Sequence, residues 1–404
     1  MKILFLSVRE PSLNGKADQI TTIKLINYLK KSNNNVDLIY KKGADLILKR
    51  SNISKLYKIT KYNFYNYLLN LIDYFFSNKP FQVILFQNNK LSKFIKKIIS
   101  KNEYDLVYCH SIRATQWLNN ISNIKKVCAQ QNSLFLNYCR LIKFSKKNMN
   151  LFYLCFYKTE LERCRKYELN LIKNFNIINL VSKKDLQYLL KLNKKSFSKY
   201  EKNYSFIPHG VDCSAYDFKK NSNKKKYDFI FLANFKSESN YQSLSIFLKE
   251  IYPLIYNKNN NILTKICGRG LFKFLENYKK RNIIPKEITF EDEVVDNNFE
   301  IASAKIFINP VYICSGMQNK ILNALANGIQ VVTTYQGFEG INQIPSNFVH
   351  VVKSNNFNDF ADMSIKALSK FDNGTFSERE AILYINRYWS WDFHHKRLLQ
   401  VLKK

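Results

Sequence analysis

The chain has 404 residues, of which 46% are hydrophobic and 24% are charged. This is roughly twice the length of an ordinary domain, so we expect two folded units with separate hydrophobic cores. No stretch reaches the ~18 consecutive apolar residues that a membrane span requires, and the apolar run after Met1 is too short for a signal peptide. The composition therefore favours a globular cytoplasmic protein over an integral membrane protein.

The formal net charge is +33, which by itself points to nucleic acid or to an anionic surface as a partner. However, 53 of the basic residues are Lys and only 11 are Arg, in a chain that is also crowded with Asn and Ile. This usage is typical of an AT-rich genome, and neither an Arg-rich stripe nor a recognised nucleic-acid-binding module is present. We therefore expect no nucleic-acid partner. Attraction to an anionic membrane face stays an alternative, because Lys serves there as well as Arg.

Apolar strand-like runs alternate with longer helical patterns along the whole chain, which predicts a parallel α/β architecture. The expected strands of the first half are 2–7, 36–40, 106–110, 126–129 and 177–181. Those of the second half are 227–232, 263–267, 287–290, 305–309, 330–334 and 348–352. Between the two sets, the polar and Lys-rich segment 211–226 is the best linker. We expect domains over 1–210 and 227–384.

The segment 91–101 has apolar residues at helical spacing and lysines on the other face. Such a helix packs on a core with a solvated basic face, or it lies on an anionic membrane. The first interpretation is favoured, and the same alternatives apply to 140–147.

Two places in the first half follow predicted strands and are candidates for ligand contacts. His110 ends the strand 106–110 and is a candidate to contact the acceptor or the reacting sugar of a transfer reaction, although a lone His is more often structural. Gly15 can let the backbone approach a sugar, whereas Asp18 is expected to cap the next helix.

The eight cysteines show no Cys-x-x-Cys pair and no His at ligand spacing, so we expect reduced core residues and no metal site.

The most informative run is 313–334, which predicts a loop, a helix and a buried strand in succession. Ser315 and Gly316 suit the start of the helix, and Gly328 is placed to end it in a left-handed conformation. Gln318, Asn319 and Lys320 would then surround a helix N-terminus, whose unpaired N–H groups attract a diphosphate. An ordinary surface helix of an α/β domain is the alternative.

This run resembles the donor-binding motif of glycosyltransferases of the GT-B fold, in the family 4-like group (glycosyl transferases group 1) with a Gly-x-Gln-Asn-Lys sequence. Matching motifs are 296–310 before the loop, Gly337-Phe338-Glu339-Gly340 after it, Pro208-His209-Gly210-Val211-Asp212, and Tyr388-Trp389-Ser390-Trp391. The resemblance covers most of the chain. It implies two Rossmann-like doubly wound domains facing a cleft, with a C-terminal helix over 385–404 that crosses back to the first domain.

The resemblance also implies roles for individual residues. Lys236, after the strand 227–232, is a candidate to neutralise the donor diphosphate together with Lys320. Gly268 and Arg269 resemble the Gly-rich turn beside the base and ribose. Where many family members carry two acids around this corner, the chain has Ser315 and Asn323; an amide at 323 loses about 1–2 kcal/mol relative to a charge-assisted bond to ribose.

The expected function is transfer of a sugar from a nucleotide-diphosphate donor to a glycan or lipid-linked acceptor, with retained configuration and without metal or cofactor. Assembly of capsule, exopolysaccharide or lipopolysaccharide on the cytoplasmic membrane face suits this chemistry. A non-catalytic sugar-nucleotide-binding protein is an alternative because of Ser315 and Asn323. A sugar-nucleotide 2-epimerase is a weaker alternative, because such enzymes need acids that this corner lacks.

Overall fold

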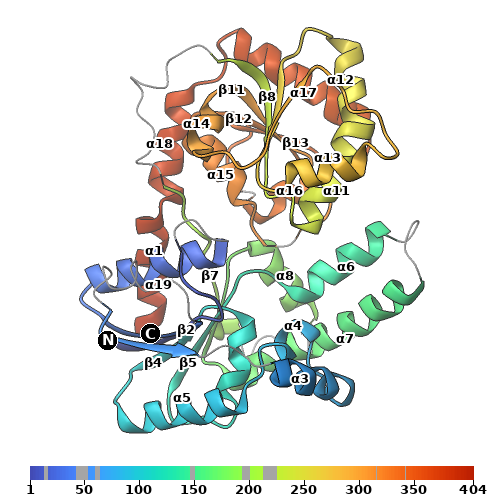
Figure 1. Cartoon of the computed structure of the whole chain (residues 1–404). Coiled ribbons are helices and arrows are strands. Elements are labelled where there is room, and N and C mark those ends of the chain that lie inside the picture. The colour runs from blue at the N-terminus through green and yellow to red at the C-terminus, as the bar shows by residue number, and fades with distance from the viewer. Residues whose placement is uncertain are drawn as a thin grey trace. The chain divides into compact units, whose positions relative to one another are not determined.

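The structure is a computed structural model, which describes residues 1–12, 17–41, 53–59, 64–145, 151–192, 201–212, 225–314, 316–341 and 343–404. The chain divides into two compact units. Unit 1 comprises residues 1–208 together with the end of the chain, 394–404, and unit 2 comprises residues 209–393. Each unit is an α/β body built on its own parallel sheet (Figure 1).

In the described part of unit 1, seven strands form one parallel sheet in the order β3-β2-β1-β4-β5-β6-β7. The chain runs outward from β1 to one edge and then returns to place β4 on the other side of β1. The strands are β1 (Lys2–Leu6), β2 (Asn35–Lys41), β3 (Lys55–Ile59), β4 (Leu106–Cys109), β5 (Lys125–Gln130), β6 (Ile177–Leu180) and β7 (Tyr204–Phe206).

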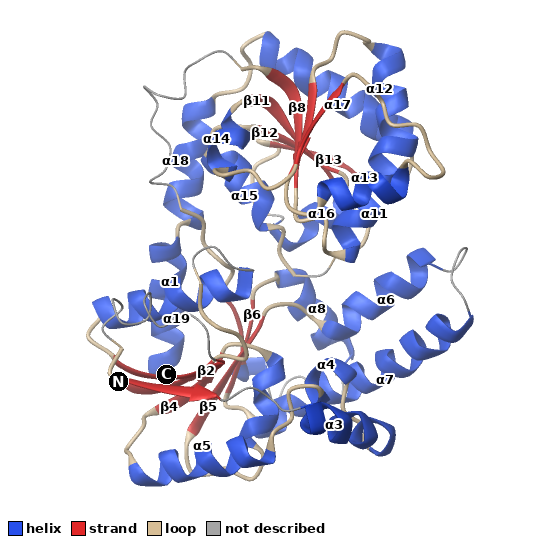
Figure 2. Cartoon of the chain, in the orientation of Figure 1, coloured by secondary structure: helices blue, strands red, loops and turns tan. Residues whose placement is uncertain are grey.

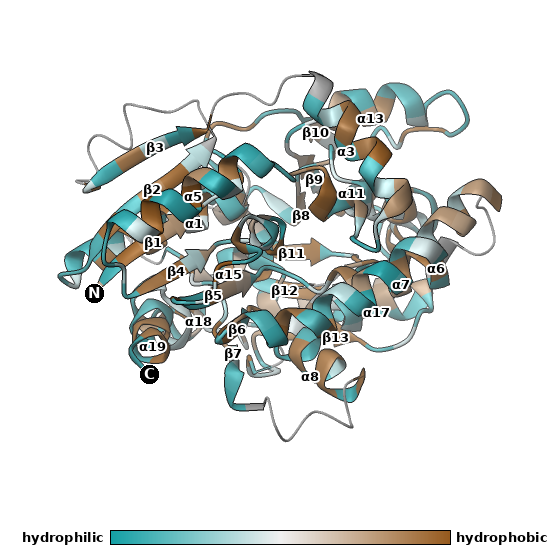
Figure 3. Ribbon diagram, turned by 90° about the horizontal axis from the view of Figure 1, so that it is seen from below, coloured by the Kyte–Doolittle hydropathy of each residue, from teal (hydrophilic) through white to brown (hydrophobic). Residues whose placement is uncertain are grey.

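The helices of unit 1 connect these strands and cover both faces of the sheet, so alternate strand residues enter different cores. Leu4 and Leu6 lie in one hydrophobic cluster, and Ile3 and Phe5 lie in the other. In Figure 3, β1 and β2 are accordingly brown over most of their length. The helices are α1 (Ala17–Lys31), α3 (Phe64–Phe76), α4 (Phe81–Ile84), α5 (Asn89–Lys101), η1 (Ile112–Leu118), α6 (Leu134–Ser145), α7 (Leu151–Asn174), α8 (Lys183–Leu192) and η2 (Glu201–Asn203).

Unit 2 repeats this topology with six strands in its described residues, in the order β10-β9-β8-β11-β12-β13. Phe229 and Phe231 of the central strand face one core, and Ile230 faces the other. The strands are β8 (Tyr227–Leu232), β9 (Thr264–Cys267), β10 (Ile288–Glu291), β11 (Ala304–Asn309), β12 (Gln330–Thr334) and β13 (Val349–Val352).

Helices flank the unit 2 sheet on both sides (Figure 2). They are α11 (Glu238–Ile246), η3 (Phe247–Ile251), α12 (Tyr252–Lys258), α13 (Leu271–Tyr278), α14 (Asn297–Ala302), α15 (Asn319–Ala326), α16 (Tyr335–Phe338), η4 (Glu339–Ile341), α17 (Phe357–Asp372) and α18 (Glu378–Trp389). The final helix, α19 (Trp391–Lys403), follows a break at Ser390, where the backbone is extended. Its residues Leu398 and Leu402 are buried in the core of unit 1.

The fold class predicted from the sequence, two parallel doubly wound sheets, is confirmed. All the predicted strands are present, with ends shifted by at most one residue. The strands β3 and β7 were not predicted, because β3 alternates lysines with apolar residues at an edge of the sheet and β7 has only three residues. The segment 91–101 packs on the core, since Leu91, Ile95 and Ile98 are buried.

Candidate functional site

In each sheet the strand order reverses at one pair of neighbouring strands, and this pair is where a doubly wound fold is expected to bind a ligand. In unit 1 the connections leave β1 and β4 on opposite sides, and in unit 2 they leave β8 and β11 on opposite sides. In doubly wound folds, ligands bind beyond the carboxyl ends of such a strand pair. The residues that follow β1, β4, β8 and β11 are therefore the first place to search for chemistry.

In unit 2 the loop after β11 leads into α15, which begins three residues later than the sequence predicted. Gly316 has a φ of +73°, a left-handed conformation that a right-handed helix cannot continue through, so the helix starts at Asn319 with Gln318 as its N-cap residue. Gln318 makes no side-chain cap bond. Ser315, the other predicted start residue, lies outside the described residues. The predicted helix end is confirmed, since Gly328 has a φ of +69°.

Lys320 lies in the first turn of α15 and reaches across to α11. Its Nζ donates to Asn240 Oδ1 at 3.0 Å and lies 5.7 Å from the centroid of the Phe231 ring. Burial lowers the pKa of the Lys320 ammonium to about 8. Neither described partner is a carboxylate, so the positive charge is available to an anion.

The loop between β8 and α11 lies beside Lys320, to which it is linked through Asn240. Asn240 Nδ2 donates to the carbonyl of Asn234 at 2.9 Å, and Asn234 Oδ1 accepts from the backbone N–H of Lys236 at 3.1 Å. These bonds fix the turn that carries Lys236, whose side chain is exposed and has no ion-pair partner in the described part of the chain. Ser239 Oγ donates to the carbonyl of Ile313, which ties the starts of α11 and the β11 loop together.

The turn after β9 requires glycine. Gly268 has a φ of +126°, and a Cβ there would lie 2.2 Å from the carbonyl oxygen of Ala233. The turn therefore rests directly on the backbone that follows β8. Asp292 Oδ1 accepts from the backbone N–H groups of Gly270 and Leu271 at 2.6 and 3.1 Å. This acid caps α13, a role that the sequence did not suggest, and Arg269 keeps an exposed guanidinium 3.8 Å from Glu293.

A second close glycine contact supports the loop after β11. A Cβ on Gly340 would lie 2.3 Å from the carbonyl oxygen of Gly316, so only glycine allows this approach. Asn319 Oδ1 is buried and has no hydrogen-bond partner in the described structure, and Asn323 is half-buried one turn further along α15. Gly316, Gln318, Asn319 and Lys320 thus lie at the turn between β11 and α15, whereas Asn323 makes no described side-chain bond.

In unit 1, His110 is the first residue after β4 and is buried. Its Nε2 lies 2.7 Å from Thr21 Oγ1, and the Thr21 hydroxyl donates to the carbonyl of Asp18 at 3.1 Å. Because that hydroxyl has one proton, His110 Nε2 carries the hydrogen of its own bond, and Nδ1 is an acceptor without a partner among the described residues. Burial lowers the pKa of His110 to about 4, so the imidazole is neutral at neutral pH.

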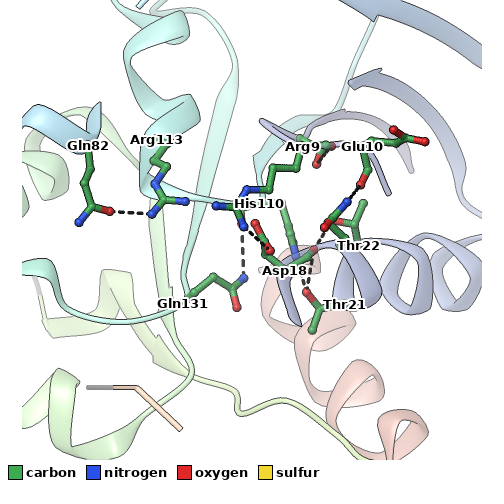
Figure 4. Close-up of polar contacts among 11 residues, drawn as sticks. Arg9, Glu10, Asp18, Thr21, Thr22, Gln82, His110, Arg113 and Gln131 are labelled. Atoms are coloured by element: carbon green, nitrogen blue, oxygen red, sulfur yellow. Dashed lines mark hydrogen bonds and ion pairs between the residues drawn. The ribbon is translucent and has the colours of Figure 1, made fainter. Parts of the chain in front are cut away.

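Asp18 was expected to cap α1, but it lies inside the first turn of this helix, and its described side-chain partner is Arg9. Asp18 Oδ1 pairs with Arg9 Nη1 at 2.9 Å. Next to this pair, Arg113 Nη2 donates to Gln82 Oε1 at 2.6 Å. Figure 4 shows these groups in the order Gln82, Arg113, Arg9, Asp18 across the carboxyl ends of the strands. Gly15, the other predicted residue of this loop, lies outside the described residues.

A buried carboxylate supports the neighbouring loop of unit 1. Glu168 accepts from Gln130 Nε2 at 2.6 Å, from Ser133 Oγ at 2.9 Å and from the backbone N–H of Leu134 at 2.6 Å. Burial nevertheless raises the pKa of Glu168 to about 8. The Glu168 side chain holds the connection from β5 to α6 in place and is closed to substrate.

Within the described ranges, no three His, Cys, Asp or Glu side chains gather as metal ligands would. Five of the seven described cysteines are buried, and those seven are free. Of the described helices, none combines the length and the apolar character needed to cross a bilayer. A surface cavity of about 840 Å³ in unit 1 lies beside Lys126 and Asn176, at the amino ends of β5 and β6 and therefore away from the residues above.

Comparison with known proteins agrees with this geometry. Residues 226–370 match the family model described as "Glycosyl transferases group 1". This segment contains β8, β9, β11 and the loops that carry Lys236, Gly268 and Lys320. This segment is therefore similar to the glycosyl transferases group 1.

Similar proteins extend the likeness beyond the group 1 segment. The chain is 24% identical over 349 residues, 84% of each sequence, to a Klebsiella pneumoniae protein described as an uncharacterized 44.6 kDa protein in the cps region. A glycosyltransferase structure from Rickettsia africae aligns with TM-score 0.64 and 17% identity, over 100% of this chain and 97% of that one. HepE of Anabaena, solved with UDP and glucose, aligns over both full lengths with TM-score 0.66 and 12% identity. The chain therefore has the GT-B fold.

Asn240, Asp292, Arg9 and Arg113 were not predicted as site residues from the sequence. Asn240 and Asp292 act through bonds to residues far away in the chain, at 80 and 22 positions, and no motif marks them. Arg9 and Arg113 carried a usable signal, since each follows a predicted strand in a chain that otherwise prefers lysine.

Proposed function

We propose that the protein is a glycosyltransferase that moves a sugar from a nucleotide-diphosphate donor on unit 2 to a glycan or lipid-linked acceptor on unit 1. The observation that carries this proposal is the half-buried ammonium of Lys320, which lies beyond the carboxyl ends of β8 and β11, where the strand order of the unit 2 sheet reverses. Its described partners are an amide and an aromatic ring, so a diphosphate would supply the missing counter-charge.

The proposed mechanism is stabilisation of the leaving group. As the bond to the sugar breaks, negative charge grows on the diphosphate, and Lys320, Lys236 and the N–H groups at the start of α15 are placed to receive it. Two lysines and a helix N-terminus supply this charge without a metal ion. Gly268 and Arg269 would lie beside the base and ribose, and Asn323 would hydrogen-bond the ribose hydroxyls. By its resemblance to the family, the reaction would retain the anomeric configuration.

His110 stays a predicted contact of the acceptor or the reacting sugar. The neutral imidazole with a free acceptor at Nδ1 suits a hydrogen bond from a hydroxyl group. Surface polysaccharide synthesis is the proposed setting, since the Klebsiella relative is described as lying in a cps region.

A thermal-shift series tests the donor site. UDP and UDP-glucose come first because HepE was solved with UDP and glucose, followed by GDP, ADP and CMP. A ligand at a hundred times its Kd stabilises the folded state by about 2.7 kcal/mol, which raises the Tm of a unit of this size by roughly 5–10 °C. The shift should vanish in Lys320→Ala and persist in Lys273→Ala, which removes an exposed lysine of α13. No shift with any nucleotide contradicts the proposal.

The alternative of a non-catalytic sugar-nucleotide-binding protein is motivated by Asn323. An Asn323→Glu variant separates the two, because a carboxylate at this position would strengthen ribose binding and raise turnover of a weak transferase. Donor binding without turnover in either protein would favour the non-catalytic function.

We further propose that unit 1 associates with an anionic membrane face, through α3 and the start of α7 rather than through α5. Leu91, Ile95 and Ile98 of α5 are buried, whereas Phe75 and Phe76 of α3 are 76% and 88% exposed. Other exposed apolar residues of the same two elements are Tyr67, Leu68, Leu69, Leu71, Ile72, Leu151, Phe152 and Tyr153. The two helices pack together, since Tyr74 donates to Glu160 at 2.9 Å (Figure 1). Several exposed apolar side chains on one helix, in a strongly basic chain, are typical of a peripheral membrane contact.

Vesicle flotation tests this contact. The full chain should float with phosphatidylcholine vesicles that contain about 30% phosphatidylglycerol, and a double variant Phe75→Ser/Phe76→Ser should stay in solution. Phe272→Ser is the matched control, because Phe272 is an exposed aromatic residue on α13 of unit 2. Equal flotation of the double variant would exclude α3 as the membrane contact.

A further inference from the structure

We infer that Arg9 and Arg113 form a phosphoryl-binding subsite on unit 1, which takes a phosphate or diphosphate group of the acceptor. The inference rests on the proposed function in one respect, namely that unit 1 binds the acceptor. The subsite itself follows from the charges, contacts and topology of unit 1.

The two arginines occupy the place where a doubly wound sheet binds its ligand. Arg9 follows β1 by three residues, and Arg113, the second residue of η1, follows β4 by four. They therefore come from the loops after the two strands at which the strand order reverses. In Figure 4 both guanidinium groups lie between Gln82 on one side and Asp18 on the other. Unit 1 thus places paired positive charges at the position where unit 2 places Lys236 and Lys320.

The charges of this group do not balance. Asp18 is the carboxylate that pairs with Arg9, whereas the described hydrogen-bond partner of the Arg113 guanidinium is the neutral amide of Gln82. Arg163 and Arg165 of α7, by comparison, are placed against Glu160 and Glu162. Arg113 is half-buried, and its Cζ lies 5.8 Å from the centroid of the Phe86 ring. A half-buried guanidinium without a carboxylate partner is costly unless an anion binds there.

The neighbourhood supports the same conclusion. Burial lowers the pKa of Arg113, the nearby charge of Arg9 lowers it further, and the charge of Asp18 raises it. One carboxylate thus lies near two guanidinium groups, which leaves one positive charge over. His110 is neutral and adds no competing charge. Figure 4 also shows the carboxylate of Glu10 pointing away from the two arginines.

A phosphoryl group matches this arrangement better than a neutral sugar does. A guanidinium is a planar fork of N–H donors that binds two phosphate oxygens at once, and two forks can bind one phosphate or the two halves of a diphosphate. The orientation of both forks is set beforehand by Gln82 and Asp18, which reduces the entropy lost on binding. We therefore expect Arg9 and Arg113 to hold the charged end of the acceptor.

The first test is binding of inorganic pyrophosphate to the full chain labelled with nitrogen-15 arginine. With 11 arginines the Nε–H signals can be resolved, and the Arg9→Lys and Arg113→Lys variants assign the two that matter. Pyrophosphate should move the signals of Arg9 and Arg113 and leave that of Arg165 in place. If it moves only Arg269, beside the proposed donor site, the inference is overturned even though donor binding stands.

The second test measures affinity by calorimetry with saturating UDP present, so that the donor site is occupied. Arg113→Gln should weaken pyrophosphate binding at least tenfold, as expected for the loss of one charge-assisted contact, and Arg113→Lys should recover part of it. Arg165→Gln, which removes an equal charge from an exposed position of the same unit, should change the Kd less than twofold. Equal binding by Arg113→Gln and wild type would overturn the inference.

Binding of a short prenyl diphosphate and of glucuronate is then compared with binding of pyrophosphate, to identify which kind of anionic acceptor the subsite takes. Tighter binding of prenyl diphosphate than of pyrophosphate, lost in Arg113→Gln, supports a lipid-linked acceptor. Equal binding of the two supports a phosphate without lipid recognition, as on a phosphorylated glycan. Glucuronate that binds more tightly than either phosphate compound would overturn the assignment to a phosphoryl group. Thermal unfolding of each variant verifies that it is folded. If UDP does not bind in the donor experiment, the nitrogen-15 signals of the arginines still test the subsite independently.

Discussion

The two units share one topology but carry different chemistry at the point where each sheet reverses direction. Unit 2 presents Gly316 there in a left-handed conformation, with Lys236 exposed after β8 and Lys320 held by an amide. Unit 1 presents two arginines, a carboxylate and a neutral histidine. In the function proposed above, the same backbone arrangement serves two kinds of recognition, because the strand order fixes where a ligand binds while the residues after the strands fix what binds.

Lys320→Ala should have the largest effect on this comparison. It removes the partly buried charge that faces the proposed diphosphate, so turnover should fall by about 10²–10³-fold, as for other losses of a preorganised transition-state contact. Donor hydrolysis or transfer to an added acceptor measures this, with Lys273→Ala as the control of equal charge. Turnover within a factor of about three of the wild-type value would mean that the diphosphate binds elsewhere. The proposed difference in chemistry between the two units would then be lost.

Gly268→Ala should disrupt unit 2 and leave unit 1 unchanged. The new Cβ would clash with the Ala233 carbonyl, and the alanine would have to keep the positive φ of Gly268. We therefore expect a loss of about 2–3 kcal/mol in the free energy of unfolding of unit 2. Gly374→Ala is the matched control, because Gly374 has a φ of +67° with nothing within 4 Å of the added carbon. That variant should lose only about 1 kcal/mol. Hydrogen exchange in β8 and β9 reports the difference.

The buried Glu168 should make the stability of unit 1 depend on pH. Its pKa in the folded state is raised to about 8, so between its ordinary value and 8 the folded state binds more protons than the unfolded state. The stability of unit 1 should therefore fall as pH rises from about 5 to 8, by up to a few kcal/mol. Glu168→Gln should flatten this dependence in hydrogen exchange of β5 and β6. A wild-type profile as flat as that of the variant would mean that the hydrogen bonds outweigh burial.

Nucleotide affinity should show the smallest effect, again through Lys320. The pKa of this lysine in the free protein is lowered to about 8, and a bound diphosphate would raise it. Binding then takes up a proton above pH 8, so the Kd for UDP should rise about fivefold between pH 8 and 9. Lys320→Arg should show no such rise, because an arginine stays charged in this range. Calorimetry at several pH values measures both. A pH-independent Kd in the wild type would exclude a titrating lysine from the donor site.

The predictions that succeeded from sequence depended on local patterns. Continuous apolar runs predicted the central strands, since a parallel strand buried on both faces contains few polar residues. The run 313–334 predicted a loop, a helix that ends at Gly328 and a buried strand, and α15 and β12 follow in that order. The error in the start of α15 was also local, because the sequence does not state which glycine takes a left-handed conformation and here Gly316 does.

Pairings across the sheets could not be predicted. Lys320 and Asn240 are 80 residues apart, and Arg113 and Gln82 are 31 apart. Asp18 was expected to cap a helix, a role that suits its position, yet Arg9 competes for its carboxylate once β1 and α1 pack together. The exposed apolar side of α3 was equally hidden, because an apolar helix reads as core until the packing shows what covers it.

The fold class, the positions of the central strands and the loop that carries Lys320 could be predicted from local patterns, because they depend on residue periodicity and on motifs within a few turns of chain. Which polar groups meet, and which of them ionise, depends on the packing of distant segments. The pKa values of Lys320, His110 and Glu168 depend on burial, and burial is set by segments that are distant in sequence. The unbalanced charge of Arg9 and Arg113 is likewise a property of the folded sheet, since it arises only when β1 and β4 lie side by side.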